Sequence, residues 1–125
     1  MEINIEVIIN KLEYKVNELT IRNAKLEKIG RIKDSLEATY RCELRKELLR
    51  SSLNNTKISI TGDITRDNAK IAQLRLNRDL VKIRYYLMKS SIENIKFEIE
   101  VLRSMLIWLR VEFSVLKDKE VTWLN

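Results

Sequence analysis

The chain of 125 residues contains no proline, no histidine, two glycines and one cysteine. Because glycine and proline shape most tight turns, a chain with only Gly30 and Gly62 has few reversals, which excludes a sheet protein built on many hairpins. Without histidine the chain lacks the commonest general base and metal ligand, and a single cysteine builds no zinc site. Neither glycine belongs to a phosphate-binding loop. We therefore expect a non-enzymatic protein without cofactor or metal.

Long uninterrupted apolar runs are also missing. The most apolar window, Ile99 to Leu116, contains four charged side chains, each costly at the centre of a bilayer, so we expect no membrane span. The N-terminus begins with an acidic residue and lacks the basic start of a signal peptide. Cys42 has no intrachain partner, which suits a reducing compartment. With 45% apolar and 34% charged residues, the chain should fold, and we expect it in the cytoplasm.

The second half of the chain carries a heptad pattern. Apolar residues alternate in steps of four and three, at Val81, Tyr85, Met88, Ile92, Ile95, Ile99, Leu102, Leu106, Leu109, Phe113 and Leu116. The same frame extends backwards through Leu74 and Ile71, with Arg78 as its one charged member, which must snorkel or find an acid. This pattern predicts a helix over residues 64–118, capped at its start by Asp63 or Thr65.

The first half is helical but less regular. Ile5, Ile9, Leu12, Val16 and Leu19 follow a heptad, and from Ile32 apolar residues recur every four, at Leu36, Tyr40, Leu44 and Leu48. We predict a helix over residues 3–52. Gly30 lies near the change of register, where either the helix kinks or a bulky side chain packs on the bare backbone, and we expect the packing.

Residues 53–63 are the polar connection between the two predicted helices. Two helices of similar length around one connection predict an all-α fold, a long antiparallel two-helix coiled-coil hairpin that makes residues 1–125 a single helical domain. Paired residues then have numbers that sum to about 117, which places Gly30 beside Tyr85.

The predicted second helix carries a further apolar row, too wide to be covered by one partner helix. Its members are Leu76, Leu80, Ile83, Leu87, Phe97, Val101, Met105, Trp108 and Val115. Either the chain self-associates into a bundle, with a dimer favoured, or a partner protein covers the row, or a break near Gly30 folds a third helix onto it. Leu87, Phe97, Val101, Met105 and Trp108 are the candidate interface residues.

The net charge of +6 is unevenly placed. Residues 22–50 hold nine basic and five acidic side chains and residues 66–89 hold seven and two, so the half next to the connection carries +9. Residues 1–21 and 90–125 together carry −3. Such a basic tip suits a phosphate backbone, although charged helix faces with ion pairs such as Glu43 with Lys46 are ordinary. The candidate nucleic-acid contacts are Arg41, Arg45, Lys46, Arg50, Lys57, Arg66, Lys70, Arg75 and Arg78, and Tyr86 is a candidate for base stacking.

Residues 60–110 resemble a family of small helical early proteins from temperate phages of low-GC Gram-positive bacteria. The resemblance rests on Asp63, Arg66, the segment from Gln73 to Asp79 and Trp108, within an Ile/Leu heptad. Gln73 replaces the lysine that opens this segment in the family. Genes of the family lie near recombination genes, which implies a role around phage DNA metabolism in the host cytoplasm, without roles for particular residues.

Three functions fit these observations. The first is a phage early protein that binds nucleic acid or a nucleoprotein complex through the basic tip. The second is an inhibitor of a host defence complex, of the anti-CRISPR type, that docks through its helical face. The third is a structural coiled-coil scaffold.

Overall fold

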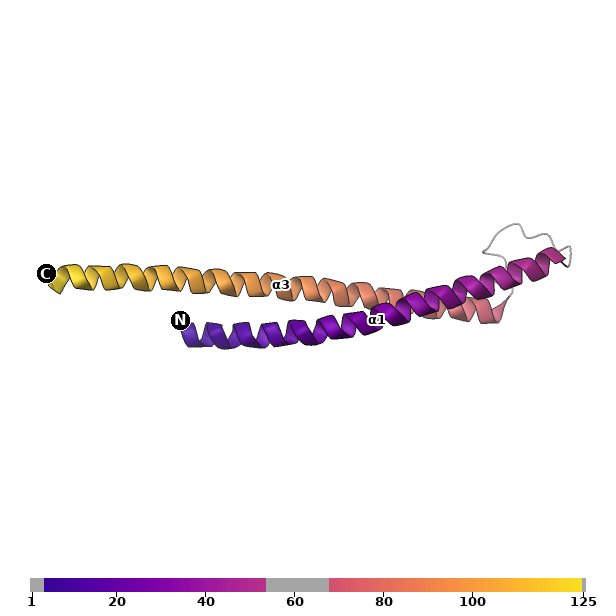
Figure 1. The fold of residues 1–125 in the computed structure, drawn as a ribbon, viewed down its shortest axis with the longest axis horizontal. Coiled ribbons are helices and arrows are strands. Elements are labelled where there is room, and N and C mark those ends of the chain that lie inside the picture. Colours follow the sequence, from indigo (N-terminus) through magenta and orange to yellow (C-terminus); the bar gives the residue numbers. More distant parts are fainter. Residues whose placement is uncertain (1–3, 54–67, 125) are drawn as a thin grey trace. The chain divides into compact units, whose positions relative to one another are not determined.

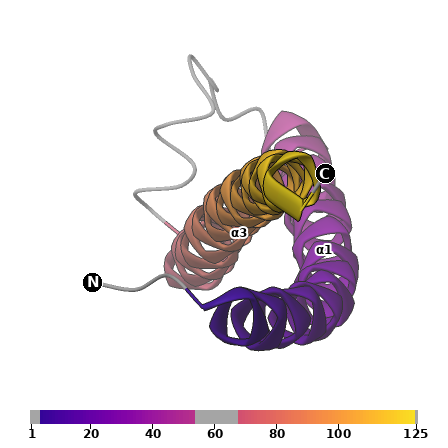
Figure 2. The same ribbon diagram turned by 90° about the vertical axis from the view of Figure 1, so that its left-hand side faces the viewer.

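The computed structural model describes residues 4–53 and 68–124, which form two α-helices, α1 (Ile5–Leu53) and α3 (Ala69–Leu124) (Figure 1; Figure 2). The two helices pack against each other, so the predicted all-α helical hairpin is confirmed. α1 matches its predicted range of 3–52 closely. α3 reaches Leu124, beyond the predicted end at residue 118. The predicted connection lies outside the described residues except for Leu53, which ends α1.

An asparagine caps the start of each helix. The Asn68 Oδ1 accepts hydrogen bonds from the backbone amides of Lys70 at 3.0 Å and Ile71 at 3.2 Å. The Asn4 Oδ1 accepts one from the backbone amide of Glu6 at 3.0 Å. Short polar side chains satisfy the first free amides of a helix in this way. Asp63 and Thr65, the predicted caps, lie outside the described residues, and the cap that the structure shows is Asn68.

The chain divides into two compact units, and α1 and α3 contribute to both. Unit 1 comprises Met1–Asn23 and Ser90–Asn125, and unit 2 comprises Ala24–Lys89. In unit 1, Lys15 contacts Glu98 and Arg22 contacts Ser91, so the two helical segments run antiparallel. In unit 2, Gly30 contacts Tyr85, as predicted, and Glu43 contacts Lys70, so the direction there is also antiparallel.

The α3 heptad supplies most of the buried side chains. In unit 1 these are Ile92, Ile95 and Ile99, together with Ile8 from α1, each at most 6% exposed. In unit 2, Tyr40 and Ile71 are buried, and Leu44, Leu48 and Leu74 pack against them. The seam predicted in α3 is therefore confirmed at its centre. At its end the seam is not buried, since Phe113 and Leu116 are 64% and 55% exposed, although both line a hollow with Asn4 and Ile5 at the start of α1.

The apolar frame predicted for α1 is confirmed only in part, since Leu12 and Leu19 are half-buried and Tyr40, Leu44 and Leu48 belong to the core of unit 2. Ile5, Ile9, Val16 and Ile32 are all at least 40% exposed. The residues of α1 that contact α3 include three cations, Lys15, Arg22 and Lys33. The long stems of these side chains lie along apolar surface while their charged ends reach a carboxylate, a hydroxyl or an aromatic ring. A hydrophobicity count overlooks such positions, which is why it selects Ile9 and Val16 in place of their more enclosed neighbours Ile8 and Lys15.

Gly30 lies inside α1, which continues through it. A Cβ atom built on Gly30 would lie 3.4 Å from Tyr85 Cε2. The bulky packing expected at this glycine is therefore confirmed, and the alternative of a break that starts a third helix is not observed. Neither described helix is long and apolar enough to cross a membrane.

Candidate nucleic-acid interface

The basic residues gather in unit 2. Residues 24–89 hold sixteen basic and eight acidic side chains, a net charge of +8, whereas the two segments of unit 1 hold eight and ten, a net charge of −2. Two folded units of one small chain therefore differ strongly in charge. Phosphate backbones bind through such sequence-independent attraction.

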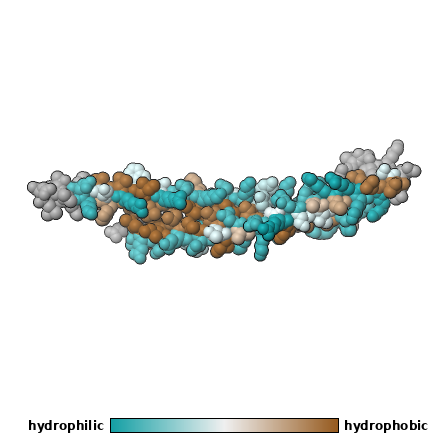
Figure 3. Space-filling view, in the orientation of Figure 1, coloured by the Kyte–Doolittle hydropathy of each residue, from teal (hydrophilic) through white to brown (hydrophobic). Residues whose placement is uncertain are grey.

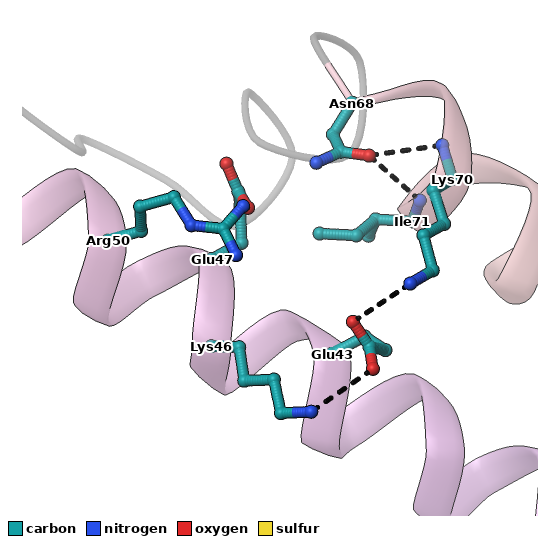
Figure 4. A network of polar contacts seen from close by, with 7 residues as sticks. All are labelled: Glu43, Lys46, Glu47, Arg50, Asn68, Lys70 and Ile71. Carbon is teal, nitrogen blue, oxygen red and sulfur yellow. Dashed lines mark hydrogen bonds and ion pairs between the residues drawn. The ribbon is translucent and has the colours of Figure 1, made fainter.

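A polar network joins the end of α1 to the start of α3 (Figure 4). The Glu43 carboxylate lies 3.5 Å from Lys46 Nζ and 3.4 Å from Lys70 Nζ. Attraction to Lys46, and next to Lys70, lowers the pKa of the Glu43 carboxyl below its ordinary value. In the same network Arg50 donates to Glu47 at 3.1 Å. The cations keep their ends in solvent, because Lys46, Arg50 and Lys70 are each more than 60% exposed at the side chain.

Arg78 occupies a different environment. Its guanidinium lies 4.4 Å from the centre of the buried Tyr40 ring, donates to Asp79 at 2.9 and 3.0 Å, and lies 3.4 Å from Glu37. The side chain is only 20% exposed. The predicted need of Arg78 for an acid in the seam is thus confirmed. Among the candidate contacts that the structure describes it is the least accessible to a ligand, because a ring and two carboxylates already surround its charge.

The other candidate contacts fall into three groups. Arg41 is exposed and donates to Glu37 at 2.8 Å, as the ordinary ion-pair interpretation expects. Arg45 and Arg75 are exposed and form no ion pair with any described residue. Lys57 and Arg66 lie outside the described residues. An exposed ion pair contributes at most about 1 kcal/mol to stability. A phosphate group can therefore still compete for the paired cations of unit 2.

Tyr86 is 53% exposed, with its ring edge-on to Tyr85 at 5.4 Å between centroids. Tyr85 itself packs on Gly30 and lies under Lys33 Nζ, 5.1 Å from its ring centre. Asp79, Lys82, Ile83 and Leu87 form a shallow depression with Tyr86. An exposed ring beside a lysine is the arrangement that stacks on an unpaired base. Tyr86 therefore keeps its candidate role, and Tyr85 is a packing residue.

One pattern escaped the sequence analysis. Every seventh residue of α3 from 75 to 117 is basic: Arg75, Lys82, Lys89, Lys96, Arg103, Arg110 and Lys117. Since seven residues make almost two helical turns, the members within each unit share one face of the helix. A search by net charge over segments does not detect this repeat, because acidic residues between its members cancel the sum in unit 1. Lys82 and Arg84 of unit 2 also form no ion pair with described residues, and both are exposed.

In unit 1 the cations that join α1 to α3, Lys15 and Arg22, are more enclosed than Lys46, Arg50 and Lys70 of unit 2. Lys15 Nζ lies 2.6 Å from Glu98, and this hydrogen bond raises the pKa of the Lys15 ammonium above its ordinary value. Arg22 donates to Ser91 and, at 2.6 Å, to Glu18. The second oxygen of Glu18 is buried and lies 3.6 Å from Lys15 Nζ, too far for a hydrogen bond. These contacts hold α1 on α3 within unit 1.

The predicted interface residues lie at the surface. Leu87, Phe97, Val101 and Trp108 are 66%, 71%, 44% and 74% exposed, and Met105 is half-buried. In unit 1, hydrophobic side chains (brown) cover part of the surface of both helices (Figure 3). The prediction that a two-helix hairpin leaves this row uncovered is confirmed.

The described helices contain no group of three or more histidine, cysteine, aspartate or glutamate residues that could hold a metal ion. Comparison of the chain with protein-family models, with curated proteins and with solved structures returned no match.

Proposed function

We propose that the chain is a non-enzymatic phage early protein that binds nucleic acid through unit 2. The observation that carries the proposal is the separation of charge between the two units, +8 against −2. The stability of a coiled coil does not depend on such a difference in charge between its two parts. A concentrated positive surface raises both the affinity for a polyanion and the rate of encounter with it.

The cations that contact phosphate first are those that form no ion pair with a described carboxylate. Arg45, Arg75, Lys82 and Arg84 meet this condition among the described residues of unit 2. Arg41, Lys46, Arg50 and Lys70 reach phosphate by exchanging a weak exposed carboxylate contact for it. Tyr86 supplies a stacking surface, which favours single-stranded over double-stranded nucleic acid.

The test compares two variants with equal net charge. The first replaces Arg45, Arg75, Lys82 and Arg84 by glutamine, and the matched control replaces the exposed unit 1 cations Lys11, Lys96, Arg103 and Arg110. Binding of a labelled 20-nucleotide single strand is measured by fluorescence anisotropy between about 50 and 200 mM salt. The unit 2 variant should bind at least about tenfold more weakly, with a salt slope flatter by up to about 3, because each lost single-strand contact removes about 0.7.

The control variant should bind nearly as well as the unchanged chain. Equal losses in the two variants would show that only net charge matters, and no binding by the unchanged chain at low salt would reject the proposal. Circular dichroism of both variants confirms that the helices remain.

The second candidate is inhibition of a host defence complex, of the anti-CRISPR type. The exposed apolar row of unit 1, with Phe97 and Trp108 more than 70% exposed, favours a protein surface as its target. A DNA-cleavage assay with a purified RNA-guided nuclease tests it directly. Inhibition that is lost in a Phe97→Ser, Trp108→Ser variant and kept in the unit 2 glutamine variant would select this function over nucleic-acid binding.

A further inference from the structure

The outward face of α3 in unit 1 carries a second heptad, separate from the seam that packs on α1. Its members alternate in steps of three and four: Asn94, Phe97, Val101, Ser104, Trp108, Val111 and Val115. Its five apolar members are between 44% and 74% exposed, whereas Ile92, Ile95 and Ile99 of the first seam are buried. A repeat of 3.5 residues matches a second supercoiled helix better than it matches a flat surface. The spacing of the apolar residues on this face therefore indicates a helical partner.

A groove of about 700 Å³ borders this second heptad. Phe97, Val101 and Leu102 of α3 form one wall, and Val7 and Tyr14 of α1 form the other. Polar ends of Asn10, Lys11 and the Lys15–Glu98 ion pair line its margin. The groove lies within unit 1 and widens the apolar face. A partner helix that packs against the second heptad therefore also contacts α1.

A second copy of the chain supplies a helix of the required kind. Core layers of an antiparallel coiled coil pair an a position of one helix with a d position of the other. One register of the second heptad sets Trp108 opposite Ser104 of the second copy, Phe97 opposite its Val115 and Val101 opposite its Val111. Each large side chain then faces a smaller one, the arrangement that lets layers interdigitate. A parallel pairing would instead stack Trp108 on Trp108 and leave Ser104 against Ser104.

The polar member at the end of the heptad fits the same register, because Asn94 then lies opposite Asp118 of the second copy. A polar residue at one a position fixes the register of a coiled coil at some cost in stability. Electrostatics also favour unit 1 as the site of association. Its net charge of −2 opposes the approach of two copies far less than the +8 of unit 2 would.

We propose that two copies associate through the second heptad of unit 1, with their α3 helices antiparallel and Val111 and Val115 of each copy seated on the groove of the other. The resulting four-helix arrangement buries Phe97, Val101 and Trp108 in both copies. This inference stands independently of nucleic-acid binding, since it uses no residue of unit 2.

The first experiment measures mass by light scattering and by sedimentation equilibrium over a range of concentrations. The unchanged chain should be a dimer. Val101→Glu should weaken dimerisation on the order of a hundredfold, because a symmetric interface contains the substitution twice and each copy buries an unpaired charge. Ile83→Glu is the matched control, since Ile83 is similarly exposed, at 57%, on α3 but lies in unit 2, and it should leave the dimer intact.

The second experiment tests the register with cysteine pairs in a Cys42→Ser background. A mixture of V101C and V111C chains should form a disulfide-linked dimer under mild oxidation, whereas V101C alone should not. Val→Cys is a small change, so this arm remains informative even if Val101→Glu loses helicity by circular dichroism. A monomer at all concentrations, equal effects of Val101→Glu and Ile83→Glu, or cross-linking of V101C to itself would overturn the proposal. A foreign protein would then be the better occupant of this face.

Discussion

The contact between Gly30 and Tyr85 allows a quantitative test of how the hairpin packs. A Cβ added at Gly30 would meet Tyr85 Cε2 at 3.4 Å and Cδ2 at 3.9 Å, which is ordinary van der Waals contact. Alanine is therefore accommodated, and within a helix it is about 0.8 to 1.0 kcal/mol more favourable than glycine. Burial of the added methyl group contributes at most about 0.8 kcal/mol and less at Gly30, which is only half-buried. The gain in helix propensity therefore dominates, and Gly30→Ala should stabilise the chain by about 1 kcal/mol.

A larger side chain at the same position should reverse the sign. Gly30→Trp has no space beneath the Tyr85 ring, and overpacking costs typically about 1 to 3 kcal/mol. Urea and thermal unfolding followed by circular dichroism measure both variants at one protein concentration, since association shifts the midpoint. Gly30→Ala should raise the thermal midpoint by about 4 °C, the shift expected near this chain length.

The Tyr85→Ala background is the control for this pair of variants. Removing the ring should leave the helix-propensity gain of alanine and relieve most of the penalty of tryptophan. The reasoning fails if Gly30→Ala destabilises the chain, or if Ala and Trp at this position have equal effects while Tyr85 is present.

Two further predictions concern the cores of the two units. Ile99→Asp should unfold unit 1, because it exchanges an apolar side chain only 6% exposed for a charge without a partner and costs more than about 4 kcal/mol; full helicity with an unchanged urea midpoint would contradict the assigned seam. The pKa of Glu43 is lowered by Lys46 and Lys70, so its ionised form stabilises the fold above the ordinary value of 4.5, and that contribution should disappear as the pH falls through the lower folded value. Urea midpoints from about pH 6 to pH 3 should therefore fall less steeply for Glu43→Gln than for the unchanged chain, and identical slopes would refute the linkage.

The sequence alone predicted the elements and the main seam. Helix periodicity is a local property, so the steps of four and three that include Ile92, Ile95 and Ile99 identified the buried face of α3 before any partner was known. The single polar connection set the antiparallel direction, and with it the neighbourhood of Gly30 and Tyr85. Both results follow because two long helices with one reversal have few ways to pair.

The register of α1 and the accessibility of the basic residues required the tertiary structure. Lys15, Arg22 and Lys33 take seam positions because their stems bury while their charges find Glu98, Ser91 and the Tyr85 ring, and those partners lie more than fifty residues away. The order of residues by itself indicated that the chain is helical and that its positive charge is concentrated in residues 24–89. Arg45 and Arg75 stay open to solvent, whereas Arg78 is enclosed. This difference depends on contacts between the two helices, and a local sequence pattern does not contain them.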